Sequence, residues 1–266
     1  SSRAIVLNAG GGTFDTNNNT TNVTQAITGS GGLTKAGDGV LNLEGSNAFG
    51  GATTVTGGAL YVNGNQSAAT GVTDVGTGAT IGGAGTIGGD VTIQNGGSLA
   101  PGRAGAVPGA LTINGDLALS NGSALEYSFG QANVVGGALN DLTTVHGNLT
   151  LDGTINVVAT PGGSFDPGVY RVISYDGTLI DNGLTVGTIP ASGYYVQTAV
   201  ANQVNLVNTS GLNLNYWDVW PASNGAIGNG AVNGGTGTWQ SSGSGGSNIN
   251  WTEPTGAVNA PYQDDA

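Results

Sequence analysis

The sequence contains a single histidine, His146, which is the first candidate for acid–base chemistry. A catalytic histidine needs a nucleophile to activate and a carboxylate to orient its ring. Asp141 and Asp152 lie nearby in the sequence, and serine and threonine are abundant. However, no Gly-x-Ser-x-Gly elbow occurs, and LTTVHGNLT is typical of a short strand and its edge. We therefore predict that His146 faces solvent or stabilises a turn and is not catalytic.

A glycine-rich segment, Gly83–Gly88, matches the Gly-x-Gly-x-x-Gly pattern of dinucleotide-binding loops. In those loops the glycines follow a strand and open a helix that holds the pyrophosphate. Here another strand pattern, DVTI at 90–93, follows almost at once. We therefore interpret the match as a consequence of glycine-rich corners and expect no cofactor.

The aspartates are scattered, and many stand beside glycine, as in Asp38-Gly39, Asp152-Gly153 and Asp176-Gly177. A calcium site needs several carboxylates that converge with carbonyl oxygens. The nonapeptide calcium repeat of β-rolls is absent. We predict that these aspartates cap the backbone of their own turns and that the chain holds no metal.

Polysaccharide cleavage is the main enzymatic alternative. Glycoside hydrolysis needs two facing carboxylates, whereas the three glutamates, Glu44, Glu126 and Glu253, lie far apart in the sequence. A lyase acting on an acidic sugar needs a strong base with cationic or metal help, and the chain has four basic residues in all. We predict that the chain is not an enzyme. A carbohydrate-active β-helix enzyme or a glycan-binding module stays as the alternative.

All four tryptophans, Trp217, Trp220, Trp239 and Trp251, fall in the last fifth of the chain. Aromatic rings can stack on sugars or anchor a protein partner, so these residues are the candidate ligand contacts. The other interpretation is structural, in which the rings pack a wider coil or cap the core.

Charge and composition restrict the partners. The formal net charge is −12, and the only basic residues are Arg3, Lys35, Arg103 and Arg171. No cationic patch can neutralise phosphates, which excludes nucleic acid and argues against anionic lipid head groups. The absence of cysteine fits a chain that is exported through an oxidising compartment.

Short strands must position all of these residues. Runs such as ALYVN at 59–63, DVTIQ at 90–94, ALTIN at 110–114 and NLTLD at 148–152 alternate apolar and polar residues. Glycine-containing turn dipeptides bound the runs, and the chain has 52 glycines, too many for helices to propagate. Self-similar short strands indicate a solenoid, in which each unit buries its apolar face against its neighbours.

Residues 31–64, GGLTKAGDGVLNLEGSNAFGGATTVTGGALYVNG, resemble the passenger-associated repeat of bacterial autotransporters (type V secretion). The matching positions are Gly32, Leu33, Thr34, Lys35, Gly37, Gly39, Gly45, Asn47, Phe49, Gly51, Thr53, Thr54, Val55, Gly57, Gly58 and Leu60. The coils through FDPGVYRVISYDG and VQTAVANQVNLVN are similar to the same family. The final segment resembles the tryptophan-bearing start of a further module, which favours the structural interpretation of the tryptophans.

The resemblance implies an all-β fold, a right-handed parallel β-helix (β-solenoid) forming one elongated domain. We expect β-helix coils over residues 1–208 and a Trp-rich segment, the start of a further module, over 209–266. The implied function is a non-catalytic segment of an adhesin passenger, exposed on a Gram-negative surface or secreted, which acts as a rigid stalk. The expected partners are a host matrix protein or glycan, or a second copy. An outer-membrane β-barrel outside this sequence would anchor the parent chain.

Two further expectations concern the shape. Coils of about 20 residues predict about 10–13 coils, and their spacing predicts a rod of about 50–60 Å. Both ends of the sequence, which begins at Ser1, are expected to be cuts within a longer solenoid. The terminal coils would then lack caps of their own.

Overall fold

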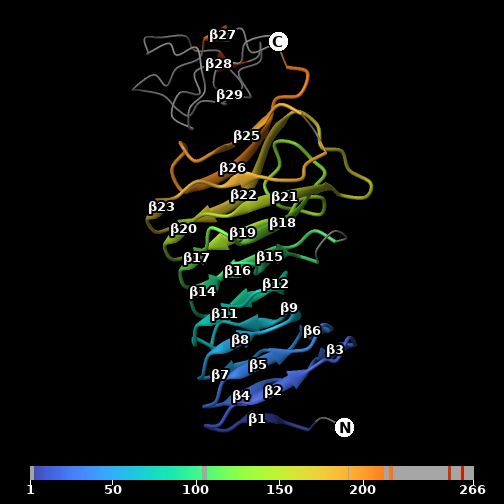
Figure 1. The fold of residues 1–266 in the computed structure, drawn as a ribbon, viewed down its shortest axis with the longest axis vertical. Helices are drawn as coiled ribbons and strands as arrows, with labels where there is room; N and C mark the ends of the chain where they lie inside the picture. Colours follow the sequence, from blue (N-terminus) through green and yellow to red (C-terminus); the bar gives the residue numbers. More distant parts are fainter. Residues whose placement is uncertain are drawn as a thin grey trace.

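A computed structural model describes residues 3–103, 107–190, 192–212, 216–217, 251–252 and 259–260. These residues form short β-strands joined by turns and contain no α-helix (Figure 1). None of them belongs to a helix that could cross a membrane. The absence of helices follows from the glycine content and from the period-2 alternation of the apolar residues.

Most strands stack into three parallel sheets, and each coil gives one strand to each sheet. The first sheet contains β2 (Gly12–Asp15), β5 (Leu33–Ala36), β8 (Thr53–Val55), β11 (Thr73–Val75), β14 (Val91–Ile93), β17 (Leu117–Leu119), β20 (Leu149–Leu151) and β23 (Leu179–Asp181). The second contains β3 (Thr20–Val23), β6 (Val40–Leu43), β9 (Gly58–Val62), β12 (Ala79–Gly83), β15 (Ser98–Pro101), β18 (Ala124–Phe129), β21 (Thr154–Ala159) and β24 (Thr185–Val186).

The third side is interrupted once. Its lower part contains β1 (Ile5–Leu7), β4 (Ile27–Gly29) and β7 (Ala48–Phe49), and its upper part begins with β10 (Asn65–Gln66), β13 (Thr86–Ile87), β16 (Ala110–Ile113), β19 (Leu142–Val145) and β22 (Gly168–Tyr175). The Asn47 amide, 3.0 Å from the Asn65 carbonyl oxygen, connects the two parts. Within each of these stacks successive strands, three places apart in the chain, pair in parallel, and only β7 and β10 at the interruption do not pair, so the predicted parallel β-helix is confirmed.

The core consists of aliphatic side chains that stack coil upon coil. In the second sheet one inward row is formed by Leu41, Leu60, Ile81, Leu99, Leu125 and Ile155. Each of these residues is fully buried. Complete burial of one such side chain stabilises the fold by about 1.5–3 kcal/mol. Because each residue of the row packs on the next, this stabilisation links successive coils.

The coils lengthen along the chain, and this corrects the expected coil number. Partners are 20 residues apart for Thr34 and Thr54, but 32 residues apart for Leu117 and Leu149. The first and second sheets therefore contain eight strands each, where the sequence predicted about 10–13 coils. At a spacing of about 4.8 Å, eight stacked strands extend over about 35–40 Å. The expectation of uniform coils was wrong because the upper coils contain longer turns between their strands.

A β-hairpin closes the C-terminal end of the helix, and this corrects a second expectation. The sequence VQTAVANQVNLVN was expected to form parallel coils, but β25 (Tyr194–Gln197) and β26 (Gln203–Asn208) pair antiparallel. β26 also pairs antiparallel with β22, so the hairpin adds two strands to the third side. Its inner strand is buried at Val204 and Leu206. The coils described here thus end in a cap supplied by this chain.

Three short strands follow in the Trp-rich segment. β27 (Tyr216–Trp217) and β29 (Asn259–Ala260) both pair antiparallel with β28 (Trp251–Thr252). The division of the chain at residue 208/209 stays a prediction.

Candidate functional site

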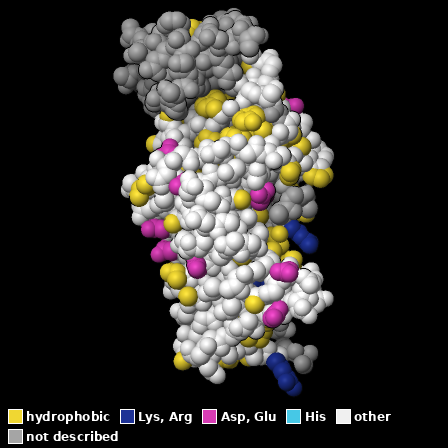
Figure 2. Space-filling model, in the orientation of Figure 1, with side chains coloured by type: hydrophobic (Ala, Val, Ile, Leu, Met, Phe, Trp, Pro, Cys, Tyr) yellow, Lys and Arg dark blue, Asp and Glu magenta, His cyan; other side chains and the backbone are white. Residues whose placement is uncertain are grey.

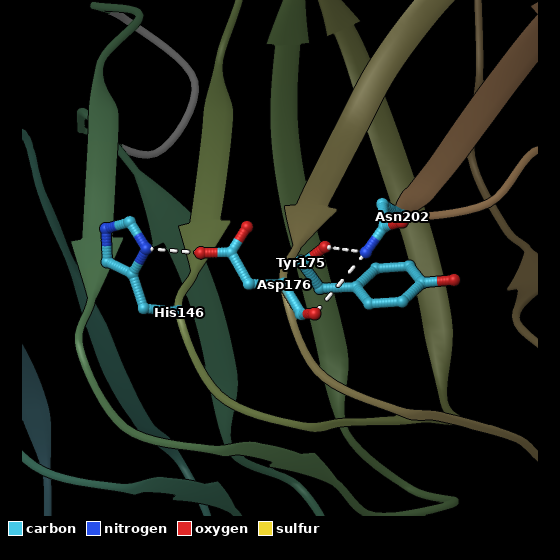
Figure 3. Close-up of polar contacts among 4 residues, drawn as sticks. All are labelled: His146, Tyr175, Asp176 and Asn202. Carbon is cyan, nitrogen blue, oxygen red and sulfur yellow. Dashed lines mark hydrogen bonds and ion pairs between the residues drawn. The ribbon is translucent and has the colours of Figure 1, made fainter.

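His146 and Asp176 form a pair on the surface of the upper coils. Each follows the last residue of a strand, and the strand ends Val145 and Tyr175 are partners in register. The His146 Nδ1 atom lies 2.6 Å from Asp176 Oδ2 (Figure 3). The two side chains are 50% and 65% exposed. The histidine faces solvent, as predicted, but its carboxylate partner comes from the next coil rather than from its neighbours in sequence.

The neighbours of this pair make hydrogen bonds that hold the strands and turns together. Asn202, in the turn of the capping hairpin, donates its side-chain amide to the Tyr175 carbonyl oxygen at 2.7 Å (Figure 3). Asp176 can orient the imidazole ring, which is one part of an acid–base dyad. Among the residues described, the His146 ring has no hydroxyl partner that it could activate. The pair alone therefore provides no nucleophile.

The two aspartates considered beside His146 have other roles. Asp141 is buried, and its carboxylate accepts hydrogen bonds from the Gly109 amide at 2.7 Å and the Ser128 amide at 2.6 Å. Desolvation by burial raises the pKa of Asp141 to about 7, although the backbone hydrogen bonds oppose this shift. Asp152 accepts a hydrogen bond from the following Gly153 amide at 2.8 Å, which is the turn-capping role predicted from the sequence.

A ladder of polar side chains, which was not predicted from the sequence, lies at the corner that leads into the first sheet. A side-chain oxygen of each coil accepts the backbone N–H of the next: Asp90 from Asp116 at 2.9 Å, Asp116 from Asn148 at 2.7 Å, and Asn148 from Thr178 at 2.9 Å. In each case the residue before the donating backbone N–H is a glycine. At Gly147, a Cβ atom would lie 2.2 Å from Asp116 Oδ1, so the ladder requires glycine there. The repeated pair Gly-Asp or Gly-Asn before an apolar strand was the available signal.

Lys35 lies inside the β-helix. It is fully buried, and its ammonium group donates hydrogen bonds to the carbonyl oxygens of Ala36 at 2.9 Å, Gly37 at 2.7 Å and Gly57 at 2.9 Å. Desolvation by burial lowers the pKa of Lys35, and the nearby carboxylates Asp15 and Asp38 oppose this shift. An ammonium group has three donors, and all three have acceptors here.

Asn47 and Phe49 also occupy interior positions of the repeat-like segment. The Asn47 side-chain oxygen accepts a hydrogen bond from the Ile27 amide at 2.8 Å, one coil below. Phe49 is 1% exposed and belongs to the core. Lys35 and Asn47 therefore bind backbone groups of neighbouring coils and do not form a solvent-facing site.

The remaining candidate motifs contain no reactive arrangement. Gly83–Gly88 begins at the last residue of β12, contains β13 and is followed by β14, so the predicted strand after these glycines is confirmed and no helix opens there. Glu126 accepts a hydrogen bond from the Asn156 side chain at 2.8 Å, and Glu253 lies outside the described residues. No group of three His, Asp or Glu side chains in the described part of the chain could hold a metal ion.

The structure brings together two of the four tryptophans at the level of the backbone. Trp217 and Trp251 are directly opposite each other in the pairing of β27 with β28. Trp251 is partly buried, and its neighbour Thr252 is fully buried. Trp220 and Trp239 lie outside the described residues. As ligand contacts, the four tryptophans stay a prediction.

A shallow groove runs along the N-terminal coils of the first sheet. The outward hydroxyl side chains of Thr13, Thr34 and Thr54 line it together with small corner residues, among them Gly32 and Ala52. The groove exists because these corner residues leave space that larger residues fill in the coils above, where Val72 and Asp90 take the same place. No charged side chain lines the groove, so it contains no group for acid–base chemistry.

Comparisons with known proteins agree with this architecture. Residues 33–62 match the passenger-associated transport repeat family. Over 253 residues the chain is 51% identical to the adhesin BmaC autotransporter of Brucella suis biovar 1 (strain 1330). The alignment covers 94% of this chain and 7% of that relative, so the chain spans a small part of the relative's length. Together, the match to the repeat family, the similarity to this relative and the parallel β-helix support a passenger segment of an autotransporter adhesin.

Proposed function

We propose that this chain is a rigid, non-catalytic section of an adhesin passenger that holds binding regions away from a bacterial surface. The continuous core carries this proposal. In the second sheet the inward aliphatic row from Leu41 to Ile155 runs through six coils without a break, and the first and second sheets each stack eight strands. A solenoid of this kind bends little because every coil is fixed to its neighbours by three sets of backbone hydrogen bonds.

The surface chemistry supports a stalk. The face in Figure 2 consists mostly of uncharged polar side chains and backbone, and the acidic residues are scattered along it. A net charge of −12 with four basic residues keeps such a rod soluble and repels other acidic surfaces. Exposure at the outer membrane of a Gram-negative bacterium, with a membrane anchor supplied elsewhere in the parent chain, is part of the proposal and rests on the relative's description as an adhesin autotransporter.

A contact surface in the Trp-rich segment is the second candidate function. The backbone pairing that places Trp217 opposite Trp251 favours it, because aromatic residues are common anchors of binding surfaces. A host matrix protein, a neutral glycan or a second copy of the chain would suit such a face. Nucleic acid would not, since the chain has no cluster of basic residues.

A binding panel distinguishes the two functions. The purified chain is tested against matrix proteins, glycans and itself by a label-free surface method at physiological salt. A stalk section gives no saturable binding. Saturable binding to one member that is lost in Trp217→Ala/Trp239→Ala, and retained when exposed Val72 is replaced by Ala, assigns adhesion to the Trp-rich segment.

The enzymatic alternative is tested by incubating the chain with the same glycans and measuring the release of reducing ends. A non-catalytic section releases none above buffer. Any release that His146→Ala or Glu126→Gln abolishes would contradict the proposal.

A further inference from the structure

Lys35 occupies a position at which the following coils have aliphatic residues. Its register partner in the next coil is Val55, and the same inward row continues with Val75, Ile93 and Leu119. An ammonium group in this row loses its hydration and must be satisfied by protein acceptors. If Lys35 only filled the core, an aliphatic residue would do so without the desolvation penalty of a buried ammonium group.

The three acceptors of Lys35 differ in origin. Ala36 and Gly37 directly follow Lys35 in the same coil, so their carbonyl oxygens move with it. The carbonyl oxygen of Gly57 belongs to the turn of the next coil. The hydrogen bond to Gly57 forms only when the coil with β5 is stacked on the coil with β8 in the native register.

Apolar contacts alone specify this register weakly. A shift by two residues along the strand keeps inward residues inward, because side chains alternate with a period of two. In the shifted pairing Ala36 would lie opposite Thr54, and Lys35 opposite Thr53. The shift would move the ammonium group about 7 Å from Gly57, leaving one donor of a buried charge without an acceptor.

We infer that Lys35 is a positioning residue that fixes the register between the coils containing β5 and β8. Its ammonium group penalises the two-residue shift that the apolar pattern tolerates. The residue lies within the segment 33–62 that matches the transport repeat, so the inference assigns one physical task to that repeat.

Cross-linking in this cysteine-free chain tests the inference. The pair Thr34→Cys/Thr54→Cys reports the native register, since Thr34 and Thr54 are outward-facing partners. The pair Ala36→Cys/Thr54→Cys reports the shifted register. Each protein is refolded from denaturant and treated with dibromobimane, which links only closely spaced thiols. With Lys35 present, we expect the native pair to react and the shifted pair to react only at background level.

The decisive variant is Lys35→Met, which keeps an unbranched side chain in the row and removes all three donors. We expect cross-linking of the shifted pair to rise at least tenfold. The matched control is Leu33→Met on the same strand, which changes the packing but not the donors and should leave the shifted pair at background. No rise in Lys35→Met, or an equal rise in Leu33→Met, would overturn the inference.

A rescue experiment covers the case in which Lys35→Met refolds poorly. The thiols of Thr34→Cys/Thr54→Cys are linked in the denatured Lys35→Met chain before refolding, which imposes the native register. We expect the yield of folded protein to return to at least half of that of the parent chain. If the yield stays low despite the imposed register, Lys35 acts only through stability and the inference fails.

Discussion

Replacement of Asn140 by alanine should destabilise the turn between β18 and β19 strongly. Asn140 is 1% exposed, and its side chain makes four hydrogen bonds. Its oxygen accepts from the Gly130 and Gln131 amides, both at 3.0 Å, and its amide donates to the carbonyl oxygens of Gln131 at 2.8 Å and Val134 at 2.7 Å. At about 0.5–1.5 kcal/mol for each bond, Asn140→Ala should lower the free energy of unfolding by about 3–5 kcal/mol.

The assay is urea unfolding followed by circular dichroism, combined with hydrogen exchange over residues 128–142. Exchange should accelerate first in this turn, because the freed backbone groups lose their partners. Gln131→Ala is the matched control, since the Gln131 side chain is exposed and should change stability by no more than about 0.5 kcal/mol. A loss below about 1 kcal/mol in Asn140→Ala, with unchanged exchange in the turn, would refute the reasoning.

Two further predictions concern titration and proteolysis. Because burial raises the pKa of Asp141 to about 7, the folded state binds a proton more tightly than the unfolded state, and this stabilisation is lost as the pH rises through 7. Between pH 5 and pH 8 the unfolding free energy of the parent chain, measured by denaturant titration, should fall by about 2–3 kcal/mol relative to that of Asp141→Asn. If the difference in unfolding free energy between the two proteins is the same at both pH values, the raised pKa of Asp141 is contradicted. Apart from Arg3 near the N-terminus, trypsin should cut first after Arg103, which is exposed, because Lys35 is buried and the Arg171 side chain donates to Asn205 at 2.7 Å. A mass-spectrometric time course measures the order of the cuts. An earlier cut after Lys35 or Arg171 would contradict this packing.

The strands could be predicted from the sequence because a local rule generates them. Glycine, one corner residue and an alternating apolar run recur in GGLTK, GATTV, GDVTI, GDLAL and GNLTL. Each run became a strand of the first sheet. The rule works because the turn needs a small residue and the strand needs an apolar residue at every second position.

The coil number and the capping hairpin could not be predicted in the same way. Alternation is identical in parallel and antiparallel strands, so QVNLVN at 203–208 contains no signal of its direction. The long turns of the upper coils resemble other glycine- and asparagine-rich segments. Their lengths decide which residues meet, and the pairing of His146 with Asp176, 30 residues later, depends on them.

The buried polar residues were hidden for a different reason. Lys35 was recognised as part of a family pattern, but its acceptors are backbone carbonyls, which any sequence supplies. Asp141 and Asn140 likewise bind backbone groups. A search for side-chain partners cannot find such contacts, because one partner has no sequence signature.

The distance between two coils far apart in the helix tests the central claim most directly. Spin labels are attached to Cys at positions 34 and 150, which are joined in the outward row by Thr54, Asp74, Thr92 and Ala118. Five steps of about 4.8 Å predict about 24 Å between the two backbones. A narrow distribution of pulsed-EPR distances consistent with this separation is the predicted result for a continuous, stiff β-helix. A broad distribution, or a much longer distance, would contradict the rigid stalk.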